Sequence, residues 1–124
     1  MTANGWLLVL LSAGLTVAAN LLLRGGVDRA GGFGGNLAEL LGALLRLAGQ
    51  PLFDLGFILY GLAALVWFRI IATQPLSTAY PLLVSLTFML VTLGAATLFQ
   101  EPVTARKLVG LAIILVGIFV IGGE

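Results

Sequence analysis

Residues 73–107 read TQPLSTAYPLLVSLTFMLVTLGAATLFQEPVTARK, and this stretch decides the fold. Residues 76–99 within it contain no charged side chain, which makes 24 uncharged residues in a row. A helix of that length spans about 36 Å at roughly 1.5 Å per residue, and the hydrocarbon core of a bilayer is about 30 Å thick. The stretch therefore predicts a membrane-spanning helix, which ends before two basic residues, Arg106 and Lys107.

The composition places the whole chain among integral membrane proteins. Of its 124 residues, 60% are hydrophobic and 9% are charged, with a mean hydropathy of +1.17, whereas soluble domains carry about 25% charged residues. The sequence has no histidine and no cysteine, which excludes disulfides, thiol or histidine catalysis and the common transition-metal sites. A net charge of +1 gives no electrostatic basis for binding nucleic acid. We therefore predict a protein that is not an enzyme and that needs no cofactor.

Other apolar runs flank this helix and predict one all-α domain over the full length of the chain. Four spans are predicted, at residues 6–23, 52–72, 76–99 and 103–121. The first is expected to be retained rather than cleaved as a signal peptide, because no basic segment precedes it. Arg24 ends this span, and a flexible glycine-rich loop is predicted over residues 25–35. Gly110 and Gly117 share one face of the last span, which suits close helix packing.

Residues 36–47, NLAELLGALLRL, are too short to cross the membrane but have a helical pattern. Leucines recur at spacings of three and four residues, at Leu37, Leu40, Leu41, Leu44 and Leu45. Asn36 suits the N-cap of a helix. We favour an amphipathic helix that lies in the membrane interface. The alternative is an extension of the following span that packs against the bundle.

The basic residues favour one orientation in the membrane. With four spans, the first and third loops lie on one side, and the two termini and the second loop lie on the other. Five of the six basic residues belong to the first and third loops, namely Arg24, Arg29, Arg46, Arg106 and Lys107. Only Arg69 lies toward the opposite side. Because basic loops stay in the cytoplasm, we expect both termini to lie outside, which is the periplasmic side in a bacterial inner membrane.

An ordered set of short motifs runs through the last two spans. It consists of Ala79-Tyr80-Pro81, a long apolar run, Glu101-Pro102-Val103, Arg106 and Gly110. This pattern resembles the small four-helix branch of the drug/metabolite transporter superfamily, which includes the small multidrug resistance proteins. Within that branch it is most similar to the small subunits of the undecaprenyl-phosphate-aminoarabinose flippase. The likeness is best over residues 67–122.

This resemblance implies a transporter of the bacterial inner membrane that moves a polyprenyl-phosphate-linked sugar of the aminoarabinose type. It also implies a homodimer, or a heterodimer with a similar small subunit. An exporter of small organic cations is one alternative. Such exporters use a glutamate in the first helix, since a buried carboxylate binds a cation and a proton in competition; Thr16 stands there in this chain. A non-transporting membrane subunit that stabilises a partner is the other alternative.

The head group of such a lipid needs a polar wall and a cation for its phosphate. The wall is expected from hydroxyl and amide side chains of the first and third spans, at Thr16, Asn20, Ser77, Thr78, Tyr80, Ser85 and Thr87. The candidate cations are Arg24, Arg69, Arg106 and Lys107. Glu101 is expected to take an amino group of the sugar or to orient Arg106.

We expect Arg69 to meet the phosphate in the outer half of the membrane, near Tyr80. Its replacement by alanine should then lower lipid binding or transport about ten- to a hundredfold, and Tyr80→Phe should do less. Each candidate also has a structural interpretation. Arg69 can snorkel to the outer surface, Glu101 can start the last helix, and Arg106 and Lys107 can serve as topology signals and headgroup anchors.

Overall fold

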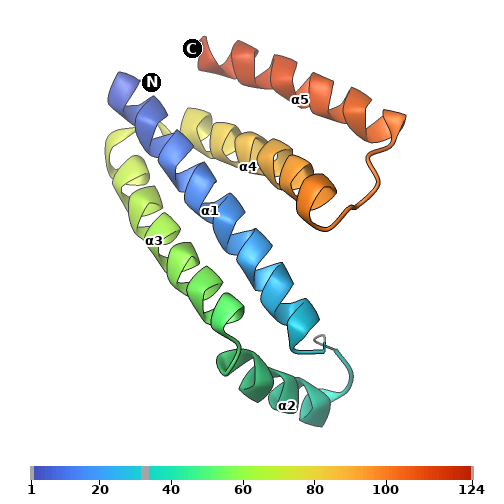
Figure 1. Ribbon diagram of the computed structural model, residues 1–124. Coiled ribbons are helices and arrows are strands. Elements are labelled where there is room, and N and C mark those ends of the chain that lie inside the picture. Colours follow the sequence, from blue (N-terminus) through green and yellow to red (C-terminus); the bar gives the residue numbers. More distant parts are fainter. Residues whose placement is uncertain (1, 32–33, 124) are drawn as a thin grey trace.

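The computed structural model describes residues 2–31 and 34–123, and within them all regular secondary structure is helical (Figure 1). The helices are α1 (Ala3–Arg29), α2 (Leu37–Ala48), α3 (Pro51–Thr73), α4 (Leu76–Leu98) and α5 (Ala105–Gly122). All except α2 are long and apolar enough to cross a membrane. The predicted fold class, an all-α protein with four transmembrane helices, is confirmed.

The bundle is closed at the end that holds the N-terminus of α1. There α1 and α3 run side by side, α4 packs on α1, and α5 packs on the outer side of α4 (Figure 1). A buried cluster joins all four long helices, at Val9, Ile70, Ala79, Leu82 and Ile118. The side chains of Thr2 and Gln74 also join the start of α1 to the α3–α4 turn, with Gln74 Nε2 donating to Thr2 Oγ1 at 3.1 Å. The helices are thus tightly packed at this end, and the cavities lie farther along the bundle.

Helix α1 is longer than the sequence predicted. It continues to Arg29 instead of ending at Arg24, so the first part of the expected glycine-rich loop is helical. Gly26 explains the difference, because a Cβ at this position would lie 2.6 Å from the backbone nitrogen of Phe53. This glycine therefore allows close contact between α1 and α3 rather than supplying a flexible loop. The predicted loop also includes residues 32 and 33, which lie outside the described residues.

The glycines expected to pack helices in the last span do not do so within this chain. A Cβ added at Gly110 or Gly117 would meet nothing within 4 Å. Close backbone contacts occur between α1 and α3 instead, where a Cβ at Gly56 would lie 2.9 Å from the Ala19 carbonyl oxygen. The seven-residue spacing in α5 was thus a misleading signal for packing inside the chain.

Helix α2 is a separate element, so the interpretation of this stretch as an extension of α3 is wrong. Asn36 caps it as predicted, accepting a hydrogen bond from the Glu39 N–H at 3.0 Å. The chain then turns at Gly49 and Gln50 before α3 begins at Pro51. Ala43 and Leu47 of α2 are buried. Four of its leucines are exposed, namely Leu37, Leu41, Leu44 and Leu45.

We predict that these exposed leucines face lipid. An environment-sensitive fluorophore on Leu41→Cys should emit as in an apolar medium when the protein is in a lipid nanodisc, because the side chain would lie among acyl chains. The same fluorophore on Glu39→Cys, on the polar side of α2, should emit as in water. Equal emission from the two sites would show that α2 does not lie in the membrane interface.

The topology predicted from the basic residues gives a second test. Gly34 lies just before α2, beside the Arg24 end of the bundle, and Thr73 lies at the closed end. In intact cells we expect an impermeant thiol reagent to label Thr73→Cys and to leave Gly34→Cys unlabelled until the membrane is permeabilised. Labelling of both sites before permeabilisation would mean that the chain inserts in both orientations.

Candidate functional site

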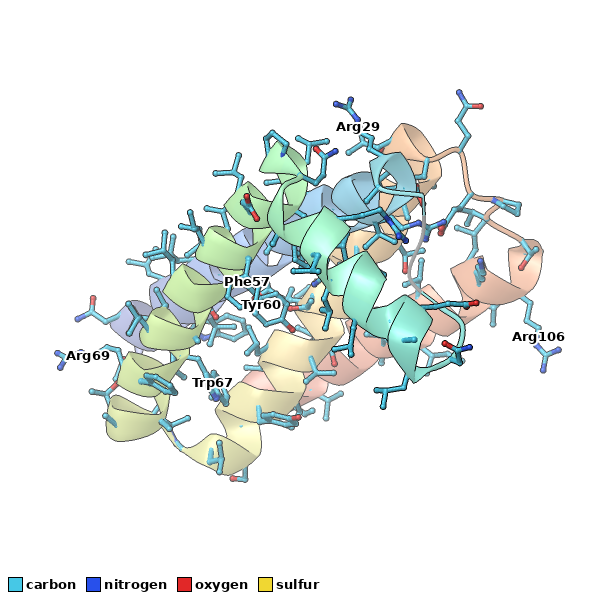
Figure 2. The ribbon with its side chains drawn as sticks, turned by 90° about the horizontal axis from the view of Figure 1, so that it is seen from below. Arg29, Phe57, Tyr60, Trp67, Arg69 and Arg106 are labelled. Carbon is cyan, nitrogen blue, oxygen red and sulfur yellow. The ribbon has the colours of Figure 1, made fainter. Side chains whose placement is uncertain are left out.

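A groove of about 510 Å³ lies between α1, α3 and α4, in the middle of the bundle. Helix α1 forms its floor with Ser12, Thr16 and Asn20. The α3 wall consists of Tyr60, Ala63, Ala64 and Trp67, and the α4 wall of Tyr80, Leu83, Val84, Thr87, Phe88 and Val91. In Figure 2, Tyr60 and Trp67 project from α3 toward α4. The volume is in the usual range for a small-molecule site, about 300–1,000 Å³.

Hydrogen bonds to the helix backbones fix the polar floor of this groove. Ser12 is buried, and its hydroxyl donates to the Ala63 carbonyl at 3.3 Å, which ties α1 to α3. The Asn20 Nδ2 donates to the Thr16 carbonyl one turn earlier, at 2.9 Å. With Nδ2 held in this way, the amide oxygen of Asn20 is available as an acceptor for a ligand.

The walls of the groove are aromatic and its lining is uncharged. The rings of Trp67 and Tyr80 lie with centroids 5.7 Å apart and planes tilted by 59°. Tyr60 and Tyr80 are both exposed, so each offers a ring face and a hydroxyl. Aromatic rings with polar tips suit a ligand that has both apolar faces and hydroxyl groups. A sugar ring has both, and a phosphate does not fit a lining without a cation.

A second cavity, of about 320 Å³, lies between α4 and α5. Most of the residues that line it are apolar. The uncharged residues of the lining are Phe88, Val91, Thr92, Ala95, Pro102, Val103, Gly110, Leu111 and Ile114. The two charged residues of the lining are Glu101 and Lys107. Phe88 and Val91 also line the first groove, so the two cavities adjoin at these residues.

A charged cluster at the open end of the bundle connects α1 to the α4–α5 loop. Arg24 Nη1 lies 3.2 Å from Glu101 Oε1, and Arg24 Nε lies 3.3 Å from Asp28 Oδ1. The guanidinium also lies over the Phe99 ring, 5.5 Å from its centroid. These side chains are about half exposed, 54% for Arg24 and 41% for Glu101, so the ion pair contributes at most about 1 kcal/mol to stability. The cluster is therefore free to exchange partners with a charged ligand at little cost in folding.

The turn before Glu101 depends on one strained residue. Gln100 has a φ of 52°, in the left-handed region, and the Glu101 N–H donates to the Ala95 carbonyl at 3.3 Å. Helix α5 then starts at Ala105, with Thr104 accepting from the Lys107 N–H. Glu101 thus lies in the loop, ahead of the helix, and the interpretation that it starts the last span is wrong.

The structure brings some of the predicted site residues together and leaves others apart. Thr16, Asn20, Tyr80 and Thr87 line the first groove. Glu101 and Lys107 line the second cavity, and Arg24 contacts Glu101. Six predicted residues line neither cavity, namely Arg24, Arg69, Ser77, Thr78, Ser85 and Arg106. The side chains of Arg69 and Arg106 extend away from the bundle (Figure 2).

Sequence reasoning missed Ser12, Tyr60 and Trp67 as groove residues. The position of Ser12 in the groove could have been predicted from the sequence. This residue belongs to a series of polar residues in α1 at every fourth position, comprising Ser12, Thr16, Asn20, Arg24 and Asp28. Residues four apart lie above one another on a helix, so this series predicts a polar path along α1. Tyr60 and Trp67 had no such signal, because aromatic residues are equally common on lipid-facing surfaces.

Comparison with curated proteins gives relatives that are named as flippase subunits. The chain is 44% identical over 69 residues to the "Probable 4-amino-4-deoxy-L-arabinose-phosphoundecaprenol flippase subunit ArnE" of Enterobacter sp. (strain 638), covering 56% of this chain and 64% of that protein. It is 52% identical over 64 residues to the protein of the same name from Serratia proteamaculans (strain 568), covering 52% and 55%. The predicted resemblance to the small flippase subunits is confirmed.

This similarity is partial along the chain. For Escherichia fergusonii, the identity to the protein named ArnE is 44% over 68 residues, covering 55% of this chain and 60% of the relative. The chain thus spans between 55% and 64% of the length of these relatives. No protein-family model matches the chain, and no solved structure matches it. The four apolar helices and these relatives together identify a multi-pass membrane protein.

Proposed function

We propose that this chain is a subunit of a flippase that moves a polyprenyl-phosphate-linked aminosugar across the bacterial inner membrane. The observation that carries the proposal is the groove between α1, α3 and α4. It has a polar floor, aromatic walls and an uncharged lining, and its rim residues Tyr60, Tyr80 and Val84 are exposed. The relatives named as subunits of an aminoarabinose-phosphoundecaprenol flippase support this substrate class.

The groove suits the physical problem of moving such a lipid. A sugar hydroxyl in hydrocarbon without a hydrogen bond costs roughly 2–7 kcal/mol, so its water must be replaced. The Thr16 and Thr87 hydroxyls and the Asn20 amide offer that replacement inside the groove. With Tyr60 of α3 and Val84 of α4 exposed at its rim, the groove would let the polyprenyl chain remain among the lipid tails while the sugar crosses. An exporter of organic cations is less consistent with this groove, since no carboxylate lines it.

We further propose that the chain acts with a second small subunit, either another copy or a similar chain. The relatives are named as subunits. Exposed apolar residues cover the outer surface of α5, among them Ile113, Val116, Phe119 and Val120. In the proposed assembly, a helix of the second subunit covers part of this surface.

Reconstitution tests the function directly. The purified chain, alone and together with a second small flippase subunit, is placed in liposomes that contain a fluorescent polyprenyl-phosphate-linked aminopentose. We expect the labelled lipid to reach the other leaflet faster than in protein-free liposomes, by a reagent-quenching assay. A rate equal to that of protein-free liposomes in both preparations would contradict the proposed function.

The cation that accompanies the phosphate gives a sharper prediction. Arg24 lies one helical turn beyond Asn20 in the polar series on α1. Loss of a charge-assisted hydrogen bond costs about 1.5–3 kcal/mol, so Arg24→Ala should slow transport about ten- to a hundredfold. Arg69→Ala, which removes a cation whose side chain extends away from the bundle (Figure 2), should slow it less than about threefold, or about 0.7 kcal/mol.

Stability measurements separate this role of Arg24 from a structural one. Because its ion pairs are exposed, Arg24→Ala should lower the free energy of unfolding by less than about 1 kcal/mol. Equal transport by the Arg24 and Arg69 variants would remove Arg24 from the path of the phosphate. A greater loss with Arg69→Ala would instead support the expectation drawn from the sequence for that residue.

A further inference from the structure

We infer that the cavity between α4 and α5 is a second, separate binding site for the charged parts of the lipid head group. In this site Glu101 binds the ammonium group of the aminosugar and Lys107 binds the phosphate. The inference rests on the proposed function, because it takes the substrate class from it. The inference adds a second binding site to the proposed function. This site can select for a charged head group, which the uncharged central groove cannot do.

The two charged residues of this cavity carry opposite charges, and apart from Thr92 the other side chains of the lining are apolar. Glu101 Oε1 is held by Arg24 Nη1 at 3.2 Å, which leaves Oε2 for a ligand. Lys107 Nζ donates to the Pro102 carbonyl at 3.2 Å, and an ammonium has three donors. Each residue is thus anchored by one contact and retains capacity for another.

The position of Lys107 favours an anion beside it. Lys107 lies in the first turn of α5, where the helix dipole also places positive charge. Helix N-termini favour negatively charged side chains, so a cation there lowers helix stability slightly, by about 0.3–1 kcal/mol. The residue is therefore poorly explained as a stabiliser of the helix, and it strengthens the positive field at the cavity. Phosphate is the anion that the substrate class supplies.

The cavity continues into the central groove along one face of α4. Residues 80, 84, 88, 91 and 95 follow each other at spacings of three and four, so they lie on the same side of the helix. The first four line the groove, and the last three line the α4–α5 cavity. A head group bound at Glu101 and Lys107 is therefore next to the groove, with Phe88 and Val91 at the boundary.

The apolar part of the cavity fits the rest of the same ligand. Its walls include Ala95, Val103, Leu111 and Ile114, which offer no partner to a sugar hydroxyl. The first isoprenoid units next to the phosphate are branched hydrocarbons that fit such walls. A zwitterionic head group on an apolar chain thus matches the cavity in both charge and polarity. A neutral sugar lipid would leave Glu101 without a ligand cation.

Binding to protein in lipid nanodiscs tests the inference with three probes. They are a polyprenyl-phosphate-linked aminopentose, its N-acetylated form, and polyprenyl phosphate without a sugar. We expect the wild type to bind the amine about tenfold more tightly than the N-acetylated form. Glu101→Gln should remove that preference and leave the affinity for the other two probes unchanged. Lys107→Met should weaken all three about tenfold.

Arg106→Met is the matched control, because Arg106 is adjacent to Lys107 and its side chain extends away from the bundle (Figure 2). It should change none of the three affinities. A Glu101→Gln variant that keeps the preference for the amine, or a wild type without one, would overturn the inference while leaving the proposed function intact. If none of the probes binds the wild type or is moved by it, the proposed function itself fails.

Discussion

Gly26→Ala should destabilise the protein by about 2–3 kcal/mol, at the upper end of the cost of overpacking. The new methyl group would lie 2.6 Å from the backbone nitrogen of Phe53 and 2.8 Å from its Cα. Backbone atoms of α3 cannot rotate out of the way as the end of a flexible side chain can, so the two helices must separate. The free energy of unfolding, measured by titration with a denaturing detergent in mixed micelles, checks this expectation.

Gly14→Ala is a matched control in the same helix, because a Cβ at this position would meet nothing within 4 Å. The same change should there be neutral or stabilising by up to about 1 kcal/mol, since alanine favours a helix over glycine. Opposite signs at the two positions would show that Gly26 is required for contact between α1 and α3. Equal effects would mean that only helix propensity is being measured and that the close contact is absent.

The sequence predicted the spanning helices well because membrane crossing depends on length and polarity, which are local properties. The uncharged run before Glu101 and the proline at position 51 fixed the positions of α4 and α3 to within a residue or two. The end of α1 was missed because glycine is consistent with two opposite roles. A glycine can allow a flexible loop, or it can allow two helices to touch. Only the position of Phe53 opposite Gly26 decides between them.

The site was predictable in part for a similar reason. Thr16, Asn20 and Tyr80 are polar groups in long apolar runs, where they are costly unless they have a role, and all three line the groove. Arg69 met the same criterion but lies one turn from a helix end, and its side chain extends away from the bundle. The α4–α5 cavity has no sequence signal of its own, because it depends on how far the Gln100 turn carries Glu101 from α4.

Val91→Trp should slow lipid transport about tenfold or more, equivalent to about 1.4 kcal/mol added to the barrier. Val91 lines both the central groove and the α4–α5 cavity. A tryptophan there would fill the boundary that a head group has to cross between the two. Binding at Glu101 and Lys107 should be weakened less than transport, because Val91 lies at the boundary of the cavity and neither charged residue is altered. The variant should therefore bind the lipid and fail to move it.

Leu90→Trp provides the control, since Leu90 is the neighbouring residue, is exposed and lines neither cavity. It adds an indole to the same helix turn on another face, so transport should stay near the wild-type rate. Rates of transbilayer movement and nanodisc affinities are compared for the two variants. If Val91→Trp transports as fast as Leu90→Trp, the cavities are not successive parts of one path. Loss of both binding and transport in Val91→Trp would instead indicate that the substitution disturbs the α4–α5 packing.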